Sequence, residues 1–376
     1  MLCFSHDWTG DPLSKTHLMR LFARKNRVLW VNSIGYRTPS LGNKKDLGRL
    51  VRKLRDAATP LREVEPNLFV LSPLAVPLWG WAGVRSFNRR FLRWQVRGAM
   101  RRLRFRRPIN WVFNPAAGVL AGDLNEDKIV YYCVDEYTAF SGVDPVALAR
   151  AEARVLDRAD LVIVSATRLQ QTKRSPTAPT VLVRHGVDYD HFRTALNPGT
   201  QVPAEIAGLP HPVIGYFGLI ASDWVDIPLL VQLARSFPGG SLVLLGKATM
   251  DVSPLQAEPN VYLLGRKPYE SLPSYCKGFD VAVIPFPVTE VTLNANPLKA
   301  REYLAAGLPV VSTPIPEVEF LGQVHIGRTV EEFVAGVRLA LREPGPSLTR
   351  SQSMATESWA ARMEEVHQHL CHVTGG

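Results

Sequence analysis

Short apolar runs rich in β-branched residues alternate along most of the chain with longer segments in which apolar residues recur every three or four positions. The short runs are typical of buried strands, and the longer segments are typical of amphipathic helices. In the first half this pattern predicts strands over 1–4, 27–32, 68–71, 110–113, 128–134, 161–165 and 180–183. In the second half it predicts strands over 213–217, 241–245, 261–264, 281–285 and 309–312.

Helical patterns lie between these runs, among them 145–157, 226–235, 269–277, 297–306 and 330–341. Strands that alternate with helices favour an α/β fold in which parallel sheets are covered by helices on both faces. The two successive sets predict two doubly wound, Rossmann-like domains. A polar segment over 195–212 contains several Pro and Gly residues and has no clear period, which is typical of a domain joint. We therefore expect one domain over 1–195 and a second over 196–356.

The positive charge of the 376-residue chain is concentrated in one place. Lys and Arg number 44 against 34 Asp and Glu, which gives a net charge of +10. Between Pro66 and Gly122 there is no acidic residue, and this stretch contains ten arginines. The other 34 basic residues balance the 34 acidic ones, so the excess charge needs a local explanation.

The arginine-rich stretch predicts a helix with two distinct faces. Phe87, Phe91 and Trp94 lie on one face, and Trp79 and Trp81 precede the helix. A separate stripe at four-residue spacing consists of Arg85, Arg89, Arg93, Arg97 and Arg101. A basic and aromatic helix of this kind suits the interface of an anionic membrane. In the alternative interpretation the aromatic residues pack on the sheet of the first domain while the arginines face water.

An arginine stripe also suits nucleic acid. The chain contains no zinc-finger spacing, no RRM-like signature and no helix-turn-helix pattern. We therefore expect no nucleic-acid partner.

Cysteine usage and hydropathy bear on the compartment. The four cysteines are far apart and form no CxxC pair, which favours free thiols in a reducing compartment over disulfides or a metal site. The apolar run at the N-terminus is too short for a secretory signal, and no stretch of about 18 uninterrupted apolar residues predicts a spanning helix. We expect a cytoplasmic protein that is peripheral on the inner face of the cell membrane.

The segment 294–313 carries the clearest site chemistry. Asn296 is a good N-cap and Pro297 suits the first position of a short helix, whose N-terminus offers N–H groups to an anion. Lys299 and Glu302 share one face of this helix. The lysine suits a diphosphate, and the carboxylate can accept two hydrogen bonds from a ribose diol. The alternative is that the two residues form an ordinary surface ion pair.

Several motifs, in order along the chain, resemble those of GT-B glycosyltransferases. Glu302-Tyr-Leu-Ala-Ala-Gly-Leu-Pro-Val-Val-Ser resembles the C-terminal signature of that fold. Ile214-Gly-Tyr-Phe-Gly218 is similar to its phosphate-side glycine loop, and Leu264-Gly-Arg-Lys-Pro-Tyr-Glu-Ser-Leu-Pro273 is similar to the segment that lines its base pocket. Segments 159–165 and 183–192 resemble the last strand of its first domain and its interdomain loop.

The resemblance covers nearly the whole chain and implies two Rossmann-like domains that face a cleft. The first domain would bind the acceptor, and a C-terminal helix over 357–376 would pack back on it. The second domain would bind a nucleotide sugar, with Lys299 and the Gly218 loop at the diphosphate, Glu302 at the ribose and Arg266 near the base.

One departure from the family pattern concerns the reaction outcome. Retaining members of the GT4 group usually carry Glu-x7-Glu, but here Asn294 stands at the first position, and Glu290 is out of register. The variant Pro297-Leu-Lys-x-x-Glu-Tyr303 instead resembles bacterial exopolysaccharide and teichuronic-acid glycosyltransferases, including glucuronosyltransferases. It implies a UDP-sugar donor, a lipid-linked saccharide acceptor and an inverting transfer. Asn294 and Asn296 are counted with the donor-binding candidates.

A candidate catalytic base follows the predicted strand over 128–134. Ligand sites of open α/β sheets lie beyond the carboxyl ends of strands, and Asp135 and Glu136 lie at that position. An inverting transfer needs a carboxylate that takes the proton of the acceptor hydroxyl. We assign this role to Asp135, with Glu136 as the next candidate. The alternative is that Asp135 caps the following helix or hydrogen-bonds the loop.

The polar loop after the first strand offers candidates for acceptor binding. His6, Asp7 and Lys15 could bind a phosphate or a sugar of the acceptor, or they could form a solvated turn and a helix cap. Asp188 and Asp190 form an Asp-x-Asp, but they follow a strand at the domain joint, so we expect a structural role and no metal cofactor.

The sequence therefore predicts a glycosyltransferase that moves a sugar from a nucleotide sugar to a lipid-linked saccharide in cell-envelope or exopolysaccharide synthesis. Two alternatives remain open. One is a glycosyltransferase that acts on a soluble natural-product acceptor, and the other is a non-catalytic protein that binds a nucleotide sugar or a polyanion.

Overall fold

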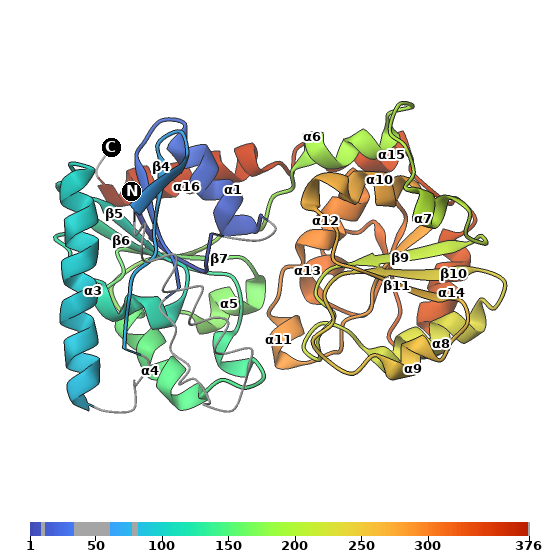
Figure 1. Ribbon diagram of the computed structural model, residues 1–376, viewed down its shortest axis with the longest axis horizontal. Helices are drawn as coiled ribbons and strands as arrows, with labels where there is room; N and C mark the ends of the chain where they lie inside the picture. Colours follow the sequence, from blue (N-terminus) through green and yellow to red (C-terminus); the bar gives the residue numbers. More distant parts are fainter. Residues whose placement is uncertain (9–11, 34–60, 77–81, 375–376) are drawn as a thin grey trace.

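The computed structural model describes residues 1–8, 12–33, 61–76 and 82–374 of the chain. These residues form two α/β domains that lie side by side (Figure 1). Each domain contains one sheet with helices packed against it. The predicted architecture of two doubly wound domains is therefore confirmed.

The described part of the first sheet has eight strands in the order β3-β4-β2-β1-β5-β6-β7-β8. Within it only β3 runs antiparallel, and it forms a hairpin with β4 through Asn67, whose φ of 63° is a left-handed conformation that Asn tolerates. The strands are β1 (Leu2–Phe4), β2 (Val28–Val31), β3 (Leu61–Glu65), β4 (Leu68–Leu71), β5 (Ile109–Val112), β6 (Lys128–Cys133), β7 (Leu161–Val164) and β8 (Thr180–Leu182). The helices and turns are α1 (Ser14–Ala23), α3 (Ala82–Arg102), η1 (Pro115–Leu120), η2 (Tyr137–Ala139), α4 (Pro145–Leu156) and α5 (Thr167–Thr172).

The second sheet has six parallel strands in the order β11-β10-β9-β12-β13-β14 within the described residues. These are β9 (Val213–Phe217), β10 (Ser241–Leu245), β11 (Val261–Gly265), β12 (Val281–Ile284), β13 (Val310–Ser312) and β14 (Val324–Ile326). Its helices and turns are α8 (Ile227–Ser236), α9 (Ser253–Gln256), η4 (Tyr269–Ser271), α10 (Leu272–Lys277), α11 (Glu290–Leu293), α12 (Leu298–Ala305), α13 (Pro316–Glu319), α14 (Val330–Ala340) and α15 (Leu348–Gln352). The connection from the first domain contains α6 (Tyr189–Phe192), η3 (Arg193–Leu196) and α7 (Ala204–Ala207).

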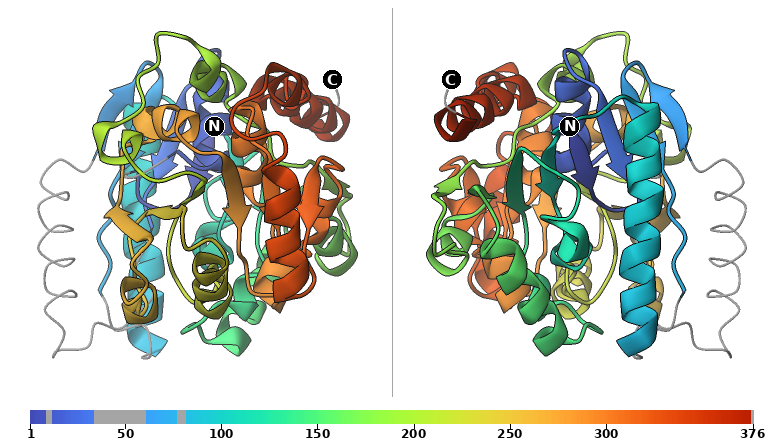
Figure 2. Two further views of the ribbon diagram at one scale, coloured as in Figure 1. Left: turned by 90° about the vertical axis from the view of Figure 1, so that its right-hand side faces the viewer. Right: turned by 90° about the vertical axis from the view of Figure 1, so that its left-hand side faces the viewer.

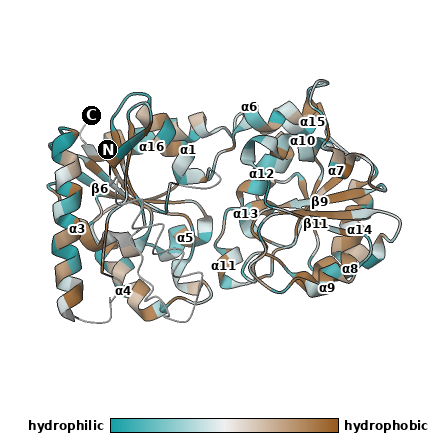
Figure 3. Ribbon diagram, in the orientation of Figure 1, coloured by the Kyte–Doolittle hydropathy of each residue, from teal (hydrophilic) through white to brown (hydrophobic). Residues whose placement is uncertain are grey.

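Burial of apolar strands holds each sheet between its helices. Strands β9, β10 and β12 are buried at every residue, as expected for parallel strands that are covered on both faces. Figure 3 shows strands of the second sheet as hydrophobic, whereas the helices around them carry both hydrophobic and hydrophilic residues. Asp226 fixes the start of α8 by accepting a hydrogen bond from the Leu229 N–H at 3.0 Å. Three of the cysteines are buried free thiols, as predicted, and Cys371 is partly exposed.

All of the predicted strands are present, with ends that shift by no more than one residue. The hydrophobic pattern does not predict β3, β14 or α1. The two strands lie at sheet edges and none of their residues is fully buried, so they carry a weak apolar signal. Helix α1 follows a polar and aromatic loop that hides its beginning.

The last helix, α16 (Trp359–Thr374), packs on the first domain although it follows the second domain in sequence (Figure 1). Its Trp359, Val366 and Leu370 belong to the same buried cluster as side chains of β1, β2, β5, β6 and β7. The chain therefore crosses the domain joint twice.

Polar contacts connect the two domains at this joint. Asn296 of the second domain donates through Nδ2 to the Ser165 carbonyl at 2.7 Å and accepts from Nη1 of the buried Arg301 at 2.7 Å. The buried Glu317 accepts from the Thr167 N–H and from Nε of Arg184, both at 2.7 Å. These hydrogen bonds fix the ends of β7 and β8 against the second domain.

Helix α3 lies on the outer side of the first domain (Figure 2), and two of its aromatic side chains are exposed. Phe87 and Trp94 are 54% and 69% exposed, and Phe91 stacks between them with ring centroids 5.7 and 5.9 Å away. The buried face of the helix consists instead of Asn88, Leu92, Val96, Ala99 and Met100. The alternative in which the aromatic residues pack on the sheet is therefore wrong.

The structure describes the side chains of four arginines of the predicted stripe, and two of these contact Asp123. Arg89 pairs with Asp123 at 2.7 Å, and Arg97 donates to the Asp123 carbonyl at 2.9 Å, so both face the loop after η1. Arg93 is half-buried and Arg101 is exposed. Four-residue spacing drifts by about 40° per step around a helix, which turns the middle of the stripe toward the domain.

Three further residues are predicted to contact the membrane. Trp79 and Trp81 lie outside the described residues, and Arg85 lies in the first turn of α3.

Gly215 in β9 leaves no room for a side chain, which provides a test of core packing. A Cβ atom added there would lie 2.0 Å from Cδ2 of the buried Phe279 ring. We expect Gly215→Ala to lower the free energy of unfolding by about 1–3 kcal/mol through overpacking, as measured by urea unfolding. Gly239→Ala is the matched control, since nothing lies within 4 Å of its added Cβ atom. Equal losses in both variants would contradict the packing argument.

Candidate active site

Loops that follow the carboxyl ends of strands from both sheets meet between the domains. In open α/β sheets these ends are where ligands bind. The loop after β6 reaches the loop after β9, where Ser141 Oγ donates to Oδ1 of Asp223 at 2.6 Å. The start of α12 approaches the end of β7 through the Asn296–Ser165 hydrogen bond. The candidate residues lie along these two edges.

Lys299 reaches the glycine loop that follows β9. A Cβ atom on Gly218 would lie 2.9 Å from Lys299 Nζ, so the ammonium group lies directly against this loop. Gly218 has a φ of 140°, which a residue with a side chain adopts only with strain. The structure thus brings together the lysine and the glycine that the sequence assigns to one site.

The Lys299 ammonium lies among aromatic rings. Its Nζ is 4.7 Å from the centroid of the Phe286 ring and 5.2 Å from that of Tyr216. Burial lowers the pKa of Lys299 to about 8, and the Glu302 carboxylate acts in the opposite direction. The described contacts of Lys299 are with the Gly218 loop and these two rings, and its electrostatic interaction with Glu302 is favourable.

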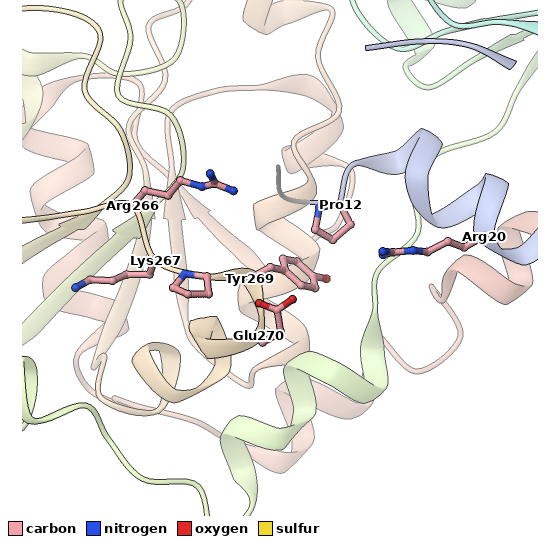
Figure 4. A pocket seen from close by; sticks show the side chains of 7 residues that line it. Pro12, Arg20, Arg266, Lys267, Tyr269 and Glu270 are labelled. Carbon is pink, nitrogen blue, oxygen red and sulfur yellow. The ribbon is translucent and has the colours of Figure 1, made fainter. Parts of the chain in front are cut away.

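A pocket of about 460 Å³ opens between α1 and the loop after β11 (Figure 4). Pro12 and Arg20 of the first domain line one side, and residues 266–270 line the other, with Arg266 and Tyr269 among them. Burial raises the pKa of Tyr269, and the nearby Glu302 carboxylate adds to this rise. Glu302 therefore lies near the segment 264–273, which the sequence predicts to line the pocket for the nucleotide base.

Asn296 is engaged within the protein rather than at the start of α12. The N-cap of α12 is Pro297, and the predicted capping role of Asn296 is wrong because its amide bridges Ser165 and Arg301 instead. Its backbone carbonyl also accepts from His185 Nδ1 at 2.8 Å. Asn296 thus contributes to the domain joint.

Asn294 is buried and contacts the acidic residue that is out of register in the sequence. Its Nδ2 donates to the Glu290 carbonyl at 2.7 Å and to Oε2 of Glu290 at 3.2 Å. The Glu290 carboxylate also pairs with Arg168 of the first domain at 3.3 Å. The short helix α11 therefore places the Glu290 carboxylate next to Asn294.

Asp135 lies two residues beyond the end of β6 and is half-buried. Burial raises the pKa of Asp135 to about 6, and the Lys15 ammonium acts in the opposite direction. Asp135 does not cap the following turn, since Glu136 does so by accepting from the Thr138 N–H. A carboxylate with a pKa near neutrality at this edge is suited to accept a proton.

Glu136, the second candidate base, is held in an ionic network. Its carboxylate accepts from Thr138 Oγ1 at 2.6 Å and pairs with the buried Lys173 at 2.7 Å, which also pairs with Glu152 at 2.7 Å. Burial alone would raise the pKa of Glu136, but the hydrogen bonds from Lys173 and Thr138 hold it below its usual value. The geometry therefore favours Asp135 as the proton acceptor.

Of the acceptor candidates, Lys15 lies within the electrostatic field of Asp135. Burial lowers the pKa of Lys15, and the Asp135 carboxylate opposes this shift. Burial, assisted by Lys15, lowers the pKa of His6 to about 3, so this imidazole is neutral. Asp7 accepts from the N–H and the hydroxyl of Ser33 at 3.1 and 2.9 Å, which fixes the loop. The structure thus places Lys15 near both Asp135 and His6, while Asp7 fixes the loop through Ser33.

Two general features complete the site. In the described ranges no three His, Cys, Asp or Glu side chains are grouped as metal ligands. None of the helices within those ranges is both long and apolar enough to cross a membrane.

Sequence reasoning missed the aromatic walls of the site. Phe286 follows β12 after one proline, so its place beyond a buried strand was a usable signal. Tyr216 lies inside β9, where an aromatic residue is indistinguishable from any other core residue.

Comparison with known proteins agrees with this geometry. Residues 212–343, most of the second domain, match the family model described as glycosyl transferases group 1. A protein named as a teichuronic acid biosynthesis glycosyltransferase, TuaH of Bacillus subtilis (strain 168), is 24% identical over 283 residues, which are 69% of this chain and 70% of TuaH.

Solved structures share the fold over the whole chain. Sucrose-phosphate synthase from Thermosynechococcus elongatus superposes with a TM-score of 0.67 at 16% identity, covering 100% of this chain and 98% of that one. HepE of Anabaena in complex with UDP superposes with a TM-score of 0.65 at 15% identity, covering 99% of each chain. The protein is therefore a glycosyltransferase with the GT-B fold, and its second domain is similar to the group 1 glycosyl transferases over residues 212–343.

Proposed function

We propose that this glycosyltransferase moves a sugar from a UDP-sugar to a lipid-linked saccharide during assembly of a cell-envelope polysaccharide. The transfer inverts the anomeric centre, uses no metal ion and takes place at the inner face of the cell membrane. The name of TuaH refers to teichuronic acid biosynthesis, and HepE has been solved with UDP and with UDP-glucose, which supports this class of donor and product. The observation that carries the proposal is the contact between Lys299 and the Gly218 loop.

A half-buried ammonium beside a glycine loop supports a diphosphate site. The backbone at Gly218 can approach a phosphate closely, and the rings of Phe286 and Tyr216 keep water away from the lysine. When the bond between C1 of the sugar and UDP breaks, negative charge grows on the diphosphate. Lys299 stabilises that charge more strongly than the charge of the bound donor, which accelerates the reaction. This assigns to Lys299 the role that a divalent cation has in other transferases.

Asp135 is the proposed general base. An acceptor hydroxyl attacks C1 from the side opposite UDP, its proton passes to the Asp135 carboxylate, and UDP leaves with the bonding electrons. One C–O bond forms and one breaks, and the configuration at C1 inverts. Lys15, which lies in the field of Asp135, suits a phosphate group of the acceptor, and the neutral His6 beside it can hydrogen-bond a sugar.

The exposed face of α3 supports attachment to an anionic membrane. Phe87, Phe91 and Trp94 form its apolar series, and the exposed Arg90 and Arg101 lie on the same side of the helix. Aromatic rings insert at the boundary between headgroups and acyl chains, while arginines attract anionic lipid. The absence of acidic residues over 66–122 removes repulsion from this surface.

The donor site is tested by the pH dependence of UDP binding. Because the pKa of Lys299 is about 8, the free protein loses the ammonium charge above that pH. We expect the Kd for UDP, measured by calorimetry, to be level near pH 7 and to rise by up to about tenfold per pH unit above pH 8. Lys299→Met should weaken binding about 10- to 100-fold at pH 7, equivalent to about 1.4–2.7 kcal/mol.

Lys299→Arg provides the matched control, since a guanidinium stays charged throughout this range and should abolish the pH dependence. A wild-type Kd that does not change between pH 7 and 9.5 would contradict the role of Lys299. If neither UDP, GDP nor ADP shifts the melting temperature of the wild-type protein, the donor site itself is wrong.

The role of Asp135 is tested by separating turnover from binding. Asp135→Asn should lower kcat about 10²- to 10⁴-fold, with the Kd for UDP changed less than about threefold. In the wild-type enzyme kcat/KM should fall tenfold per pH unit below about pH 6, because the base must be deprotonated. Both kcat and kcat/KM are measured from the release of UDP, with a lipid extract of bacterial membranes as the source of acceptor. A variant that keeps its turnover would rule out Asp135 as the base.

Membrane attachment is tested by flotation with vesicles that contain anionic lipid. Replacing Phe87 and Trp94 together by Ser should reduce the bound fraction severalfold, because the exposed aromatic series is lost. Phe320→Ser is the matched control, since this ring is 62% exposed but lies on the second domain. Equal binding by the α3 variant and the wild type would argue against the proposed membrane face.

A further inference from the structure

The loop that follows η2 in the first domain contacts the loop that follows β9 in the second domain. The ring of Phe140 in the first domain lies 5.8 Å from the ring of Trp224 in the second, measured between centroids. Next to this contact Ser141 Oγ donates to Asp223 Oδ1 at 2.6 Å. We call the Phe140–Trp224 and Ser141–Asp223 contacts the cross-domain bridge.

The bridge continues into the donor side of the site. Trp224 lies 5.3 Å from the Phe286 ring, and Phe286 lies 4.7 Å below the Lys299 ammonium. The loop that carries Trp224 begins at Gly218, whose backbone lies against the same ammonium group. Trp224 therefore packs, through Phe286, against the surroundings of Lys299.

The bridge also continues into the loop that carries the proposed base. Phe140 lies 6.3 Å from the ring of Tyr137, and the Tyr137 hydroxyl donates to the Phe113 carbonyl at 2.7 Å. Tyr137 follows Asp135 by two residues, so this hydrogen bond anchors the turn beyond the carboxylate. Packed rings thus connect Asp135 to Lys299 through both domains.

We propose that Phe140 and Trp224 are positioning residues that set the distance between Asp135 and the diphosphate site, an inference that rests on the function proposed above. The base belongs to one domain and the donor to the other, so transfer requires a fixed relation between them. A misplacement of about 1 Å can lower the rate about 10²-fold. Both rings are only partly buried, so they contribute less to the core of either domain than to the contact between domains.

A double-mutant cycle tests this inference. Phe140→Leu and Trp224→Leu should each lower kcat about tenfold, while the Kd for UDP changes less than about twofold. The double variant should lose little more than either single variant, because each one already breaks the same contact. Trp224→Phe, which keeps a ring at this position, should recover most of kcat.

The measurements use the full chain, a UDP-sugar that the wild type turns over, and a lipid extract of bacterial membranes as the source of acceptor. Phe237→Leu, a ring on the far side of the second domain beside Arg338, should leave kcat unchanged. Should Trp224→Leu not fold, Ser141→Ala takes its place in the cycle, since it removes only the hydrogen bond to Asp223.

The outcomes separate this inference from the proposed function. Additive losses in the double variant, an unchanged kcat in both single variants, or a loss of UDP affinity equal to the loss of kcat would each overturn the positioning role. A wild-type protein that neither binds UDP nor transfers a sugar would instead overturn the proposed function. Non-additive losses in kcat with UDP binding retained would support the bridge.

Discussion

The cost of placing the Lys299 ammonium in a poorly hydrated site governs the arrangement of the second domain. Desolvation disfavours the charged form, which is why the pKa of this lysine is lowered, and aromatic faces return only part of the lost hydration energy. Glycine is favoured at position 218 because its φ of 140° strains any residue with a side chain, and a Cβ atom there would lie 2.9 Å from Lys299 Nζ. An anion bound beside Lys299 would supply the missing stabilisation. The free energy lost by desolvating the ammonium group is therefore regained when such a ligand binds.

Helix α12 links this site to the domain joint because its faces serve different neighbours. Lys299 faces the Gly218 loop and Glu302 lies near Tyr269, whereas the adjacent Arg301 is completely buried and holds Asn296 at the joint. Tyr303 accepts from the Phe217 N–H at 2.8 Å and so ties the same helix to the end of β9. The positions of Lys299 and Glu302 are therefore set by the joint as much as by the second domain itself.

The sequence predicts the fold well and the site in part, for physical reasons that differ between residues. The buried strands follow from apolar runs, which a sequence displays directly. The association of Lys299 with the Gly218 loop follows instead from the resemblance to GT-B glycosyltransferases. The role of Asn296 could not be predicted, since its partners Ser165 and Arg301 become neighbours only after both domains have folded and docked. For the same reason the arginine spacing in α3 could not predict the contacts of Arg89 and Arg97 with Asp123, which lies on a loop that the helix meets only in the folded domain.

Burial acts with opposite sign on the two groups that the proposed reaction needs in ionised form. It raises the pKa of Asp135 to about 6 and lowers the pKa of Lys299 to about 8, so both groups are charged only between these values. In each case a neighbour of opposite charge, Lys15 or Glu302, opposes the effect of burial and keeps this interval open. Deeper burial would strengthen the electrostatic interactions with the substrate but would also narrow that interval, so the partial exposure of both side chains is a balance between rate and ionisation.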